Sequence, residues 1–379
     1  MKTAPPRDSE WLGSLQGVRV LDLTTYLPGP YATMLMADLG ADVIQVEPST
    51  GDPGRHVPPR HRDSSALHQW VARGKRSVSL DLKLTSDHDV FMNLVRGCDV
   101  VFEGFTPGVA ERLAVSYSDC VDVKPDIVYC SISGLGHDYE DGRSPGHEIN
   151  FAARAGLLDQ VRDSVGAPVA IGPPLADLSG GLHAAVGVLA ALRHRDRTGQ
   201  GQFVDVSLMG SALALAGPQL VKQWTAEPVA REHDHNLGAD PAYRTYAARD
   251  GRHLALGGLE AKFWTRLCEV IDRPDLRDLR VLDPGRAAEE LSKMFAAKDR
   301  CEWDELLEDA GVCYSPVNTV GEVGADRHVV GRGDLDVSLE GDVSLRNPIR
   351  LSATRSKPTG PAPALSASSR SDWLPRNPA

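Results

Sequence analysis

The chain has 379 residues, a formal net charge of −11, and 41% hydrophobic and 25% charged residues. This length predicts two domains, and the composition is that of an ordinary soluble globular protein. The negative charge argues against a nucleic acid partner. The longest apolar runs, near residues 18–23 and 184–192, are too short to span a bilayer, and residues 1–6 lack the apolar core of a signal peptide. We therefore expect a cytoplasmic protein that does not enter a membrane.

Strands and helices are predicted to alternate over the first 135 residues. Residues 18–23 are largely apolar, and the Pro28-Gly29-Pro30 that follows is typical of a break before a helix, which Gly40 would end. The expected elements after the first strand are a helix at 31–39, strands at 41–47 and 77–82, a helix at 87–96, a strand at 100–102, a helix starting at 108–113 and a strand at 127–131. Because a strand, a helix and a strand in about thirty residues form a βαβ unit, the pattern predicts a parallel, doubly wound, Rossmann-like sheet.

The clearest helix is predicted at residues 182–194. Leu182, Val186 and Leu189 recur at spacings of three and four, and residues 193–195 place positive charge at its C-terminal end. A strand at 204–207 and a helix at 211–224 should follow.

The sequence after this region turns polar through residues 226–239, where we place a domain boundary. A strand at 254–256 and a helix at 263–271 then predict a smaller α+β domain. The last 25 residues have too few apolar side chains to make a core, so we expect an extended tail. The predicted organisation is a leader at 1–13, a large α/β domain at 14–225, a small domain at 226–325, and a return to the large domain with the tail at 326–379.

Several common cofactor and metal motifs are missing from the sequence. The turn after the first strand reads Thr25-Tyr26-Leu27-Pro28-Gly29-Pro30 rather than G-x-G-x-x-G, which argues against NAD or FAD. A Walker loop, a G-x-S-x-G elbow and a histidine pair at metal-ligand spacing are also missing. The six cysteines form no C-x-x-C pair, which argues against a zinc site and a disulfide framework. We expect no metal and no permanently bound cofactor.

His147 and Asp177 are the main candidates for chemistry. They lie in the small-residue-rich segments 145–151 and 174–181, where glycines would let a substrate approach the backbone. A histidine and a carboxylate can act together as an acid/base pair, and Glu260, after a later apolar strand, could orient the imidazole. Each also has an ordinary explanation: Asp177 as a helix N-cap, His147 as a hydrogen-bonded histidine and Glu260 as a helix cap.

Several segments resemble the superfamily of family III CoA-transferases and alpha-methylacyl-CoA racemases, and this resemblance covers about residues 14–350. Residues 17–23 with Pro28-Gly29-Pro30 and residues 37–43 resemble its N-terminal signature. Residues 74–83 and 102–105 resemble its CoA-binding segments. Residues 198–202 and 205–207 resemble the stretch that closes its large domain.

The resemblance implies roles for the candidate residues. An aspartate at the place of Asp177 is the nucleophile in the transferases and one of two acid/base groups in the racemases. The racemase-like branch adds a histidine, here His147, and a glutamate, here Glu260. Both positions hold the residue type of the racemase-like branch, which favours a racemase over a transferase. Glu148, Phe151 and Thr106 depart from the usual residues, as does the C-terminal segment 365–369.

The resemblance also implies the substrate, partners and fold. We expect an acyl-CoA substrate, an interlocked homodimer, and a large Rossmann-like domain with a smaller α+β domain. Basic groups should line the path of the CoA phosphates, and the residues themselves offer a local basic patch at Arg73, Lys75 and Arg76. The expected CoA-binding residues are Arg76, Asp81, Lys83, Phe105, Thr106, Arg112, Gly146, Glu148, Ile149, Asn150 and Phe151.

The leading hypothesis is a racemase of 2-methylacyl-CoA thioesters that uses His147 and Asp177 on opposite faces of the acidic carbon. Main-chain N–H groups near Asp177 would stabilise the enolate oxygen. The first alternative is a CoA-transferase with Asp177 as its nucleophile. The second is a non-catalytic acyl-CoA-binding protein, and a related possibility diverts the same enolate to elimination or another carbon-acid reaction.

Overall fold

The computed structural model describes residues 13–61, 64–137, 142–163, 165–225, 233–337, 343–354 and 360–368. The chain divides into a large unit, up to Gly217 and again from Val330, and a small unit from Pro218 to Val329. The sequence placed these boundaries at 225/226 and 325/326, a few residues away. The first boundary falls inside a helix, α9 (Leu208–Gln223), at the proline that interrupts it. The expected leader lies outside the described residues except for Gly13.

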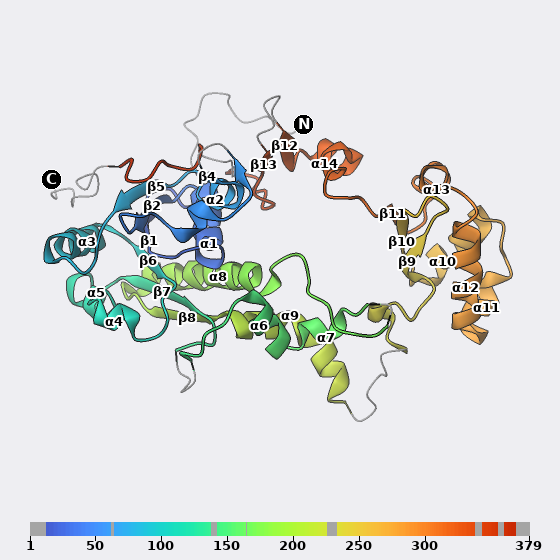
Figure 1. Cartoon of the computed structure of the whole chain (residues 1–379), viewed down its shortest axis with the longest axis horizontal. Coiled ribbons are helices and arrows are strands. Elements are labelled where there is room, and N and C mark those ends of the chain that lie inside the picture. The colour runs from blue at the N-terminus through green and yellow to red at the C-terminus, as the bar shows by residue number, and fades with distance from the viewer. Residues whose placement is uncertain are drawn as a thin grey trace. The chain divides into compact units, whose positions relative to one another are not determined.

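Six parallel strands form the centre of the large unit, in the order β5-β2-β1-β6-β7-β8 (Figure 1). These strands are β1 (Arg19–Asp22), β2 (Asp42–Glu47), β5 (Arg76–Ser79), β6 (Val100–Glu103), β7 (Val128–Ser133) and β8 (Phe203–Ser207). The inner strands are buried on both sides, as parallel strands between helical layers must be. The spatial order, counted along the chain, is 3-2-1-4-5-6, so the predicted doubly wound sheet is confirmed.

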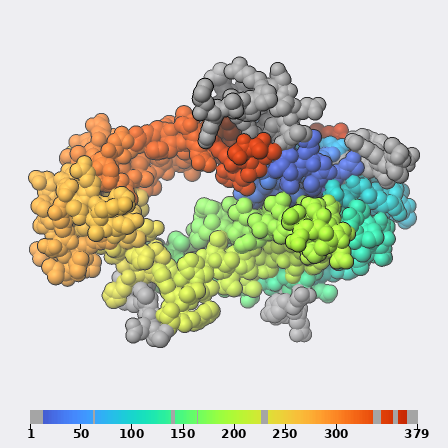
Figure 2. All heavy atoms as spheres, turned by 180° about the vertical axis from the view of Figure 1, so that it is seen from behind, coloured from blue at the N-terminus to red at the C-terminus, as the bar shows by residue number. Residues whose placement is uncertain are grey.

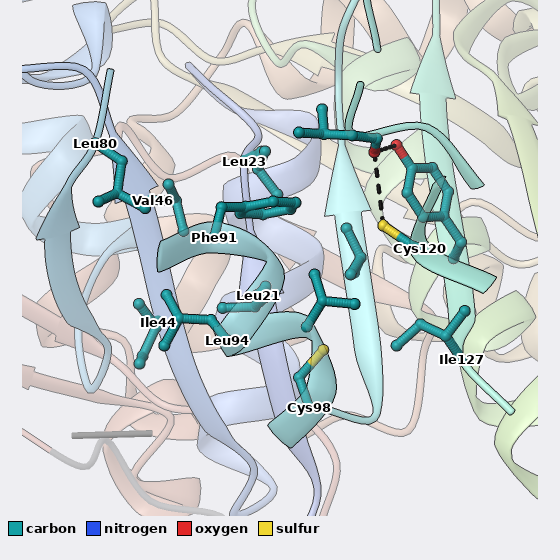
Figure 3. Packing of buried hydrophobic residues seen from close by; sticks show 14 of the residues in the cluster. Leu21, Leu23, Ile44, Val46, Leu80, Phe91, Leu94, Cys98, Cys120 and Ile127 are labelled. Carbon is teal, nitrogen blue, oxygen red and sulfur yellow. Dashed lines mark hydrogen bonds between the residues drawn. The ribbon is translucent and has the colours of Figure 1, made fainter. Parts of the chain in front are cut away.

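Helices cover both faces of this sheet. On one face α8 (Leu175–Thr198) contacts β7, β8 and α1 (Pro28–Asp38). On the other face α3 (Thr85–Gly97) packs beside α5 (Tyr117–Val123). There Phe91 and Leu94 of α3 meet Leu21 and Ile44 of the sheet, all of them buried (Figure 3). Burying such a side chain contributes about 1.5–3 kcal/mol, so this core fixes the strands whose ends carry the site.

Short elements complete the large unit. They are η1 (Pro53–His56), β3 (Arg60–His61), β4 (Ser64–Ser65), α2 (Ala66–Val71), α4 (Val109–Arg112), α6 (Glu148–Arg154), α7 (Leu157–Gln160), β12 (Leu335–Val337) and β13 (Val343–Leu345). β3 pairs with β4 and β12 pairs with β13, both antiparallel. The C-terminal segment 360–368 returns to the edge strand β5, where the Ser366 N–H donates to the Ser77 hydroxyl and the Ser368 N–H to the Ser77 carbonyl.

The small unit has its own sheet and core. Its antiparallel strands β9 (Tyr243–Ala247), β10 (His253–Gly257) and β11 (Tyr314–Pro316) lie in the order β11-β10-β9. The other elements are η3 (His235–Leu237), α10 (Ala261–Val270), α11 (Leu276–Leu282), α12 (Pro284–Phe295), α13 (Arg300–Leu307) and η4 (Val323–Ala325), and α14 (Arg327–Arg332) crosses the second boundary. Buried Leu254, Trp264 and Phe295 join the sheet to the helices.

Helix α8 is longer than predicted at both ends. The prediction began at Leu182, where the apolar periodicity starts, but the helix begins directly after Pro174 and ends at Gly199 in the left-handed conformation. Asp177 therefore lies in its first turn rather than at an N-cap. By length and composition α8 could cross a bilayer, yet half of its most apolar window is buried against the rest of the unit. Its other side is open, with Val186 63% exposed. Residues coloured green, the part of the chain to which α8 belongs, reach the surface seen in Figure 2.

Close packing of α8 against α1 predicts a large effect at Gly181. A Cβ on this residue would lie 2.5 Å from the Pro28 carbonyl oxygen, which is backbone and cannot rotate away. We expect Gly181→Ala to lower the free energy of unfolding by about 1–3 kcal/mol in urea titrations. Gly217→Ala, in α9 with no atom within 4 Å of the added carbon, is the control and should be neutral or slightly stabilising. Equal effects of the two substitutions would contradict the packing argument.

Candidate active site

The topology of the sheet predicts where a ligand binds. Strands β1 and β6 are neighbours, and the chain leaves them toward opposite faces, because α1 lies on one face and α5 on the other. In doubly wound folds ligands bind outside the carboxyl ends of the strands at this switch point. A cavity of about 430 Å³ lies there. It is lined by Thr24, Thr25, Tyr26, Pro28, Gly29, Gly104, Phe105, Thr106, Pro107, Ile132, Ser133, Gly134, Gly142, Ser144, Pro145, Gly146, His147, Glu148, Phe151, Asp177 and Leu208.

His147 and Asp177 both line this one cavity. His147 is the N-cap residue of α6, is exposed, and its N–H donates to Asn150 Oδ1 at 3.0 Å. Asp177 is half-buried in the first turn of α8. Each side chain is thus held at the start of a different helix, and α6 and α8 contact one another. This arrangement brings an imidazole and a carboxyl group to the same space.

Glu148 joins the two helix starts. Its carboxylate accepts hydrogen bonds from the Ala176 N–H at 3.1 Å and from the Asp177 N–H at 2.8 Å. An anion at a helix N-terminus is favourable because it meets unpaired donors and the positive end of the helix dipole. The expectation that the N–H groups near Asp177 face a substrate oxygen is wrong for these two groups, because Glu148 already occupies them.

Asp177 is the carboxyl group in the cavity whose environment most favours the neutral form. Burial raises the pKa of Asp177 from 3.8 to about 7, and the negative charge of Glu148 adds to the increase. At neutral pH the acid and the carboxylate are therefore both well populated. A group with its pKa near the working pH can both take and give a proton, which is what general acid–base chemistry requires.

Phe151 explains the glycines around His147. Its ring lies so close that a Cβ on Gly134 would be 2.5 Å from the ring, and one on Gly146 would be 2.9 Å from it. Phe151 is 5% exposed and lines the cavity between these two glycines. The aromatic ring thus supports the turn before α6, and the small residues predicted to admit a substrate also admit this ring.

The turn after β1 forms another wall of the cavity, and the buried carboxylates of Asp22 and Asp52 hold it in place. The N–H and hydroxyl of Thr24 both donate to Asp22, and the Tyr26 N–H donates to Asp52 Oδ1 at 3.3 Å. Tyr26 has a φ of 62°, in the left-handed region that a tyrosine adopts only at a cost. The wall is therefore fixed by polar contacts, while the Tyr26 side chain remains 48% exposed.

Two residues of the predicted basic patch have structural roles instead. Lys75 is buried and donates to Asp22 Oδ2 at 3.1 Å, and Arg73 forms a buried ion pair with Asp38 at 2.5 Å. Buried charges need such partners because leaving water is costly. The interpretation of Arg73 and Lys75 as ligand-binding cations is therefore wrong. Arg76 pairs with Asp42 at the amino end of β5, away from the strand ends that carry the cavity.

The other predicted binding residues divide into two groups. Phe105, Thr106, Gly146, Glu148 and Phe151 line the cavity. The remaining ones do not line it: these are Arg76, Asp81, Lys83, Arg112, Ile149 and Asn150.

Three of the predicted binding residues that do not line the cavity lie just after a strand of the sheet or after a loop of the cavity. Asp81 and Lys83 are exposed just beyond the carboxyl end of β5. Arg112 lies on α4, directly after the cavity loop at Thr106 and Pro107.

Glu260 belongs to the small unit, where it is the N-cap residue of α10. Its hydrogen bond to His147 stays a prediction. Within the described ranges, no group of three or more His, Cys, Asp or Glu side chains is arranged to hold a metal ion.

A comparison with known protein families decides the family of this chain. The sequence pattern of CoA-transferase family III matches residues 15–369. This chain belongs to CoA-transferase family III. Similar curated members of the family include a succinyl-CoA:mesaconate CoA-transferase from Haloarcula hispanica, 34% identical, with 93% of this chain and 94% of that protein aligned. They also include an alpha-methylacyl-CoA racemase from Homo sapiens, 33% identical, with 88% and 85% aligned.

Solved structures agree with this family assignment. A hypothetical protein from Mycobacterium tuberculosis matches with a TM-score of 0.83 at 28% identity, covering 95% of this chain and 98% of the other. A CAIB/BAIF family protein from Brucella suis matches with a TM-score of 0.81 at 27% identity, covering 94% and 97%. The family III fold is thus shown, and the relatives include both transferases and racemases.

Sequence reasoning missed part of the family III cavity. Of Thr24, Thr25 and Tyr26, only the last two enter the prediction, as part of a turn that lacks the dinucleotide motif, and Ser133 and Leu208 do not enter it. The strand order supplies the signal that could have found the first three, because the loop after β1 must border the switch point. Leu208 had no such signal, since it reaches the cavity through contact with Gly180 of α8.

The raised pKa of Asp177 predicts a pH-dependent gain in stability for Asp177→Asn. The folded-state pKa of about 7 exceeds the unfolded value, so the folded protein binds more protons and loses stability as pH rises from about 4 to 7. The amide removes this penalty, so its stabilisation should be small at pH 4.5, about a quarter of its full size, and about 1–3 kcal/mol at pH 8. Urea unfolding at the two pH values measures this. Asp122→Asn, exposed on α5, is the control, and equal gains for Asp177→Asn at both pH values would contradict the account.

Proposed function

We propose that this family III member is a racemase or epimerase of 2-methylacyl-CoA thioesters. The observation that carries the proposal is that His147 and Asp177 line one cavity, with the pKa of Asp177 raised to about 7. A transferase needs one nucleophile, whereas inversion at carbon needs two groups that exchange protons. The second group is present here, at the start of a separate helix.

The proposed reaction moves one proton at a time. The thioester carbonyl acidifies the neighbouring C–H bond, and one of the two side chains removes that proton. The electron pair of the bond then forms the double bond of an enolate. The other side chain, in its protonated form, delivers a proton to the opposite face and restores the C–H bond. Because Asp177 is half protonated near pH 7, it can begin or finish the reaction, depending on the enantiomer.

Several further parts of the proposal concern binding and assembly. The guanidinium groups of Arg112 and Arg143 both lie near Gly108, next to the cavity residues Thr106 and Pro107, which supports binding of CoA phosphates there. We also propose that Glu260 orients His147 and that the enzyme is a cytoplasmic homodimer. The exposed apolar side chains of α8 support a protein contact on that face.

A CoA-transferase is the second candidate, because curated relatives with that activity match 93% of this chain at up to 34% identity. In this reaction the Asp177 carboxylate attacks the thioester carbonyl and CoA leaves as the thiolate. The thiolate then attacks the Asp177 carbonyl of this anhydride, which releases the donor acid and leaves CoA on Asp177 as a thioester. The acceptor carboxylate attacks that thioester to form a second anhydride, and the CoA thiolate released attacks the acceptor's acyl carbon, which gives the new thioester and restores the Asp177 carboxylate. Only the ionised form of Asp177 can attack, and burial reduces its population at neutral pH. The cavity supports this reaction less well, since it gives His147 no role.

Deuterium exchange distinguishes the candidates. The enzyme is incubated in D₂O with a 2-methylacyl-CoA and no acceptor acid, and mass spectrometry follows deuterium at the α-carbon. We expect His147→Asn and Asp177→Asn each to lower exchange about 10²–10⁴-fold with the enantiomer whose proton the missing group removes, because each removes one proton carrier. His194→Asn, near the far end of α8, is the matched control and should exchange like the wild type.

Other outcomes would contradict the racemase. CoA transfer to succinate that survives His147→Asn, without exchange, would support the transferase. Tight thioester binding with neither exchange nor transfer would support a non-catalytic acyl-CoA-binding protein. Exchange accompanied by loss of a group from the acyl chain would support an enzyme that uses the same enolate for elimination.

A further inference from the structure

The charges around the cavity are unevenly distributed. Of the ionisable groups that line it, Glu148 and Asp177 are acidic and His147 is the single base. None of the lining residues, all within the described part of the chain, is a lysine or an arginine. Lys75, a buried cation, is bonded to Asp22, the Thr33 hydroxyl and the Pro30 carbonyl. The part of the cavity that holds the proposed catalytic groups is therefore anionic.

Positive charge lies outside the cavity, beside one of its loops. A Cβ built on Gly108 would lie 2.9 Å from Nη2 of Arg143 and 3.7 Å from Nη1 of Arg112. Gly108 follows the lining residues Thr106 and Pro107, and Arg143 is flanked by two further lining residues, Gly142 and Ser144. The site thus has two cations beside its loop at Thr106 and Pro107, which suit phosphates, and two acidic groups in its lining, Glu148 and Asp177.

The rest of the lining is uncharged. It consists of hydroxyl-bearing side chains, among them Thr24, Thr25 and Tyr26, and of apolar ones such as Phe105, Phe151 and Leu208. These groups can surround a hydrocarbon or accept and donate single hydrogen bonds, but they cannot neutralise a second anion. Since a sphere of about 430 Å³ is roughly 9 Å across, any charge inside it lies within about a Debye length of the two carboxyl groups.

We propose that this site selects thioesters with an uncharged acyl group and discriminates against acyl groups that carry their own carboxylate. The proposal rests on the site of the proposed function and names its substrate class. The phosphates of the thioester lie on the side of Arg112 and Arg143, so the acyl group lies toward Glu148 and Asp177. A terminal carboxylate there meets two acidic groups with no lysine or arginine in the lining.

Equilibrium binding tests the proposal without turnover. The two probes are 2-methylglutaryl-CoA and its terminal amide, which differ by one charge and hardly in shape. Calorimetry with the full-length wild type at pH 8 should give a dissociation constant about 10–100-fold lower for the amide. Thr25→Lys should reduce this ratio at least about fivefold by strengthening binding of the carboxylate, because it adds a cation to the lining. Thr25→Met, similar in length and uncharged, is the matched control and should leave the ratio unchanged.

The outcomes separate this proposal from the proposed function. Equal binding of the two probes, or tighter binding of the carboxylate by the wild type, overturns the selection for uncharged acyl groups even if α-proton exchange is observed. An unchanged ratio in Thr25→Lys, with the lysine variant folded by circular dichroism, also overturns it. A ratio in favour of the amide together with no exchange on any neutral thioester supports the selection and overturns the racemase instead.

Discussion

The carboxylate of Glu148 holds the first turn of α8 against the first residue of α6. This contact places His147 and Asp177 at one cavity, because His147 directly precedes Glu148 and the Asp177 N–H is one of the two donors. It also contributes to the chemistry of Asp177, because burial, the larger cause, and the charge of Glu148 together raise the pKa of that carboxyl group. The same anion occupies two main-chain donors, so in the proposed reaction the enolate oxygen takes its donors from elsewhere in the site. The positions of His147 and Asp177 therefore depend on one interaction, which also adds to the raised pKa of Asp177.

Beneath the cavity, a layer of buried charges keeps the turn after β1 in place. Asp22, bonded to Lys75, anchors Thr24, and Asp52 anchors Tyr26 in a left-handed conformation. Buried ion pairs stabilise a fold little, because desolvation offsets their attraction, but removing one partner is costly. Their value here is geometric. They fix the polar wall that borders the anionic part of the site. The cations that could bind a ligand, Arg112 and Arg143, lie outside the cavity.

The sequence allowed the parallel sheet to be predicted because its strands are short apolar runs separated by helical periodicity, as at residues 18–23 and 41–47. His147 and Asp177 could be found from their small-residue surroundings and from the family resemblance. The contact between Glu148 and α8 could not, since it joins residues 28 positions apart through a turn whose path depends on Phe151. The roles of Arg73 and Lys75 were misjudged because burial is decided by packing, whereas basic residues in a row look like a surface patch.

The central claim is that His147 and Asp177 act on one carbon from opposite faces. Exchange of each enantiomer of a 2-methylacyl-CoA, measured separately in D₂O with His147→Asn and with Asp177→Asn, tests this most directly. The account predicts complementary losses: each variant loses exchange mainly with the enantiomer whose proton its missing group removes, and retains exchange with the other. Equal exchange of both enantiomers by either variant, or the loss of the same enantiomer in both, would contradict it.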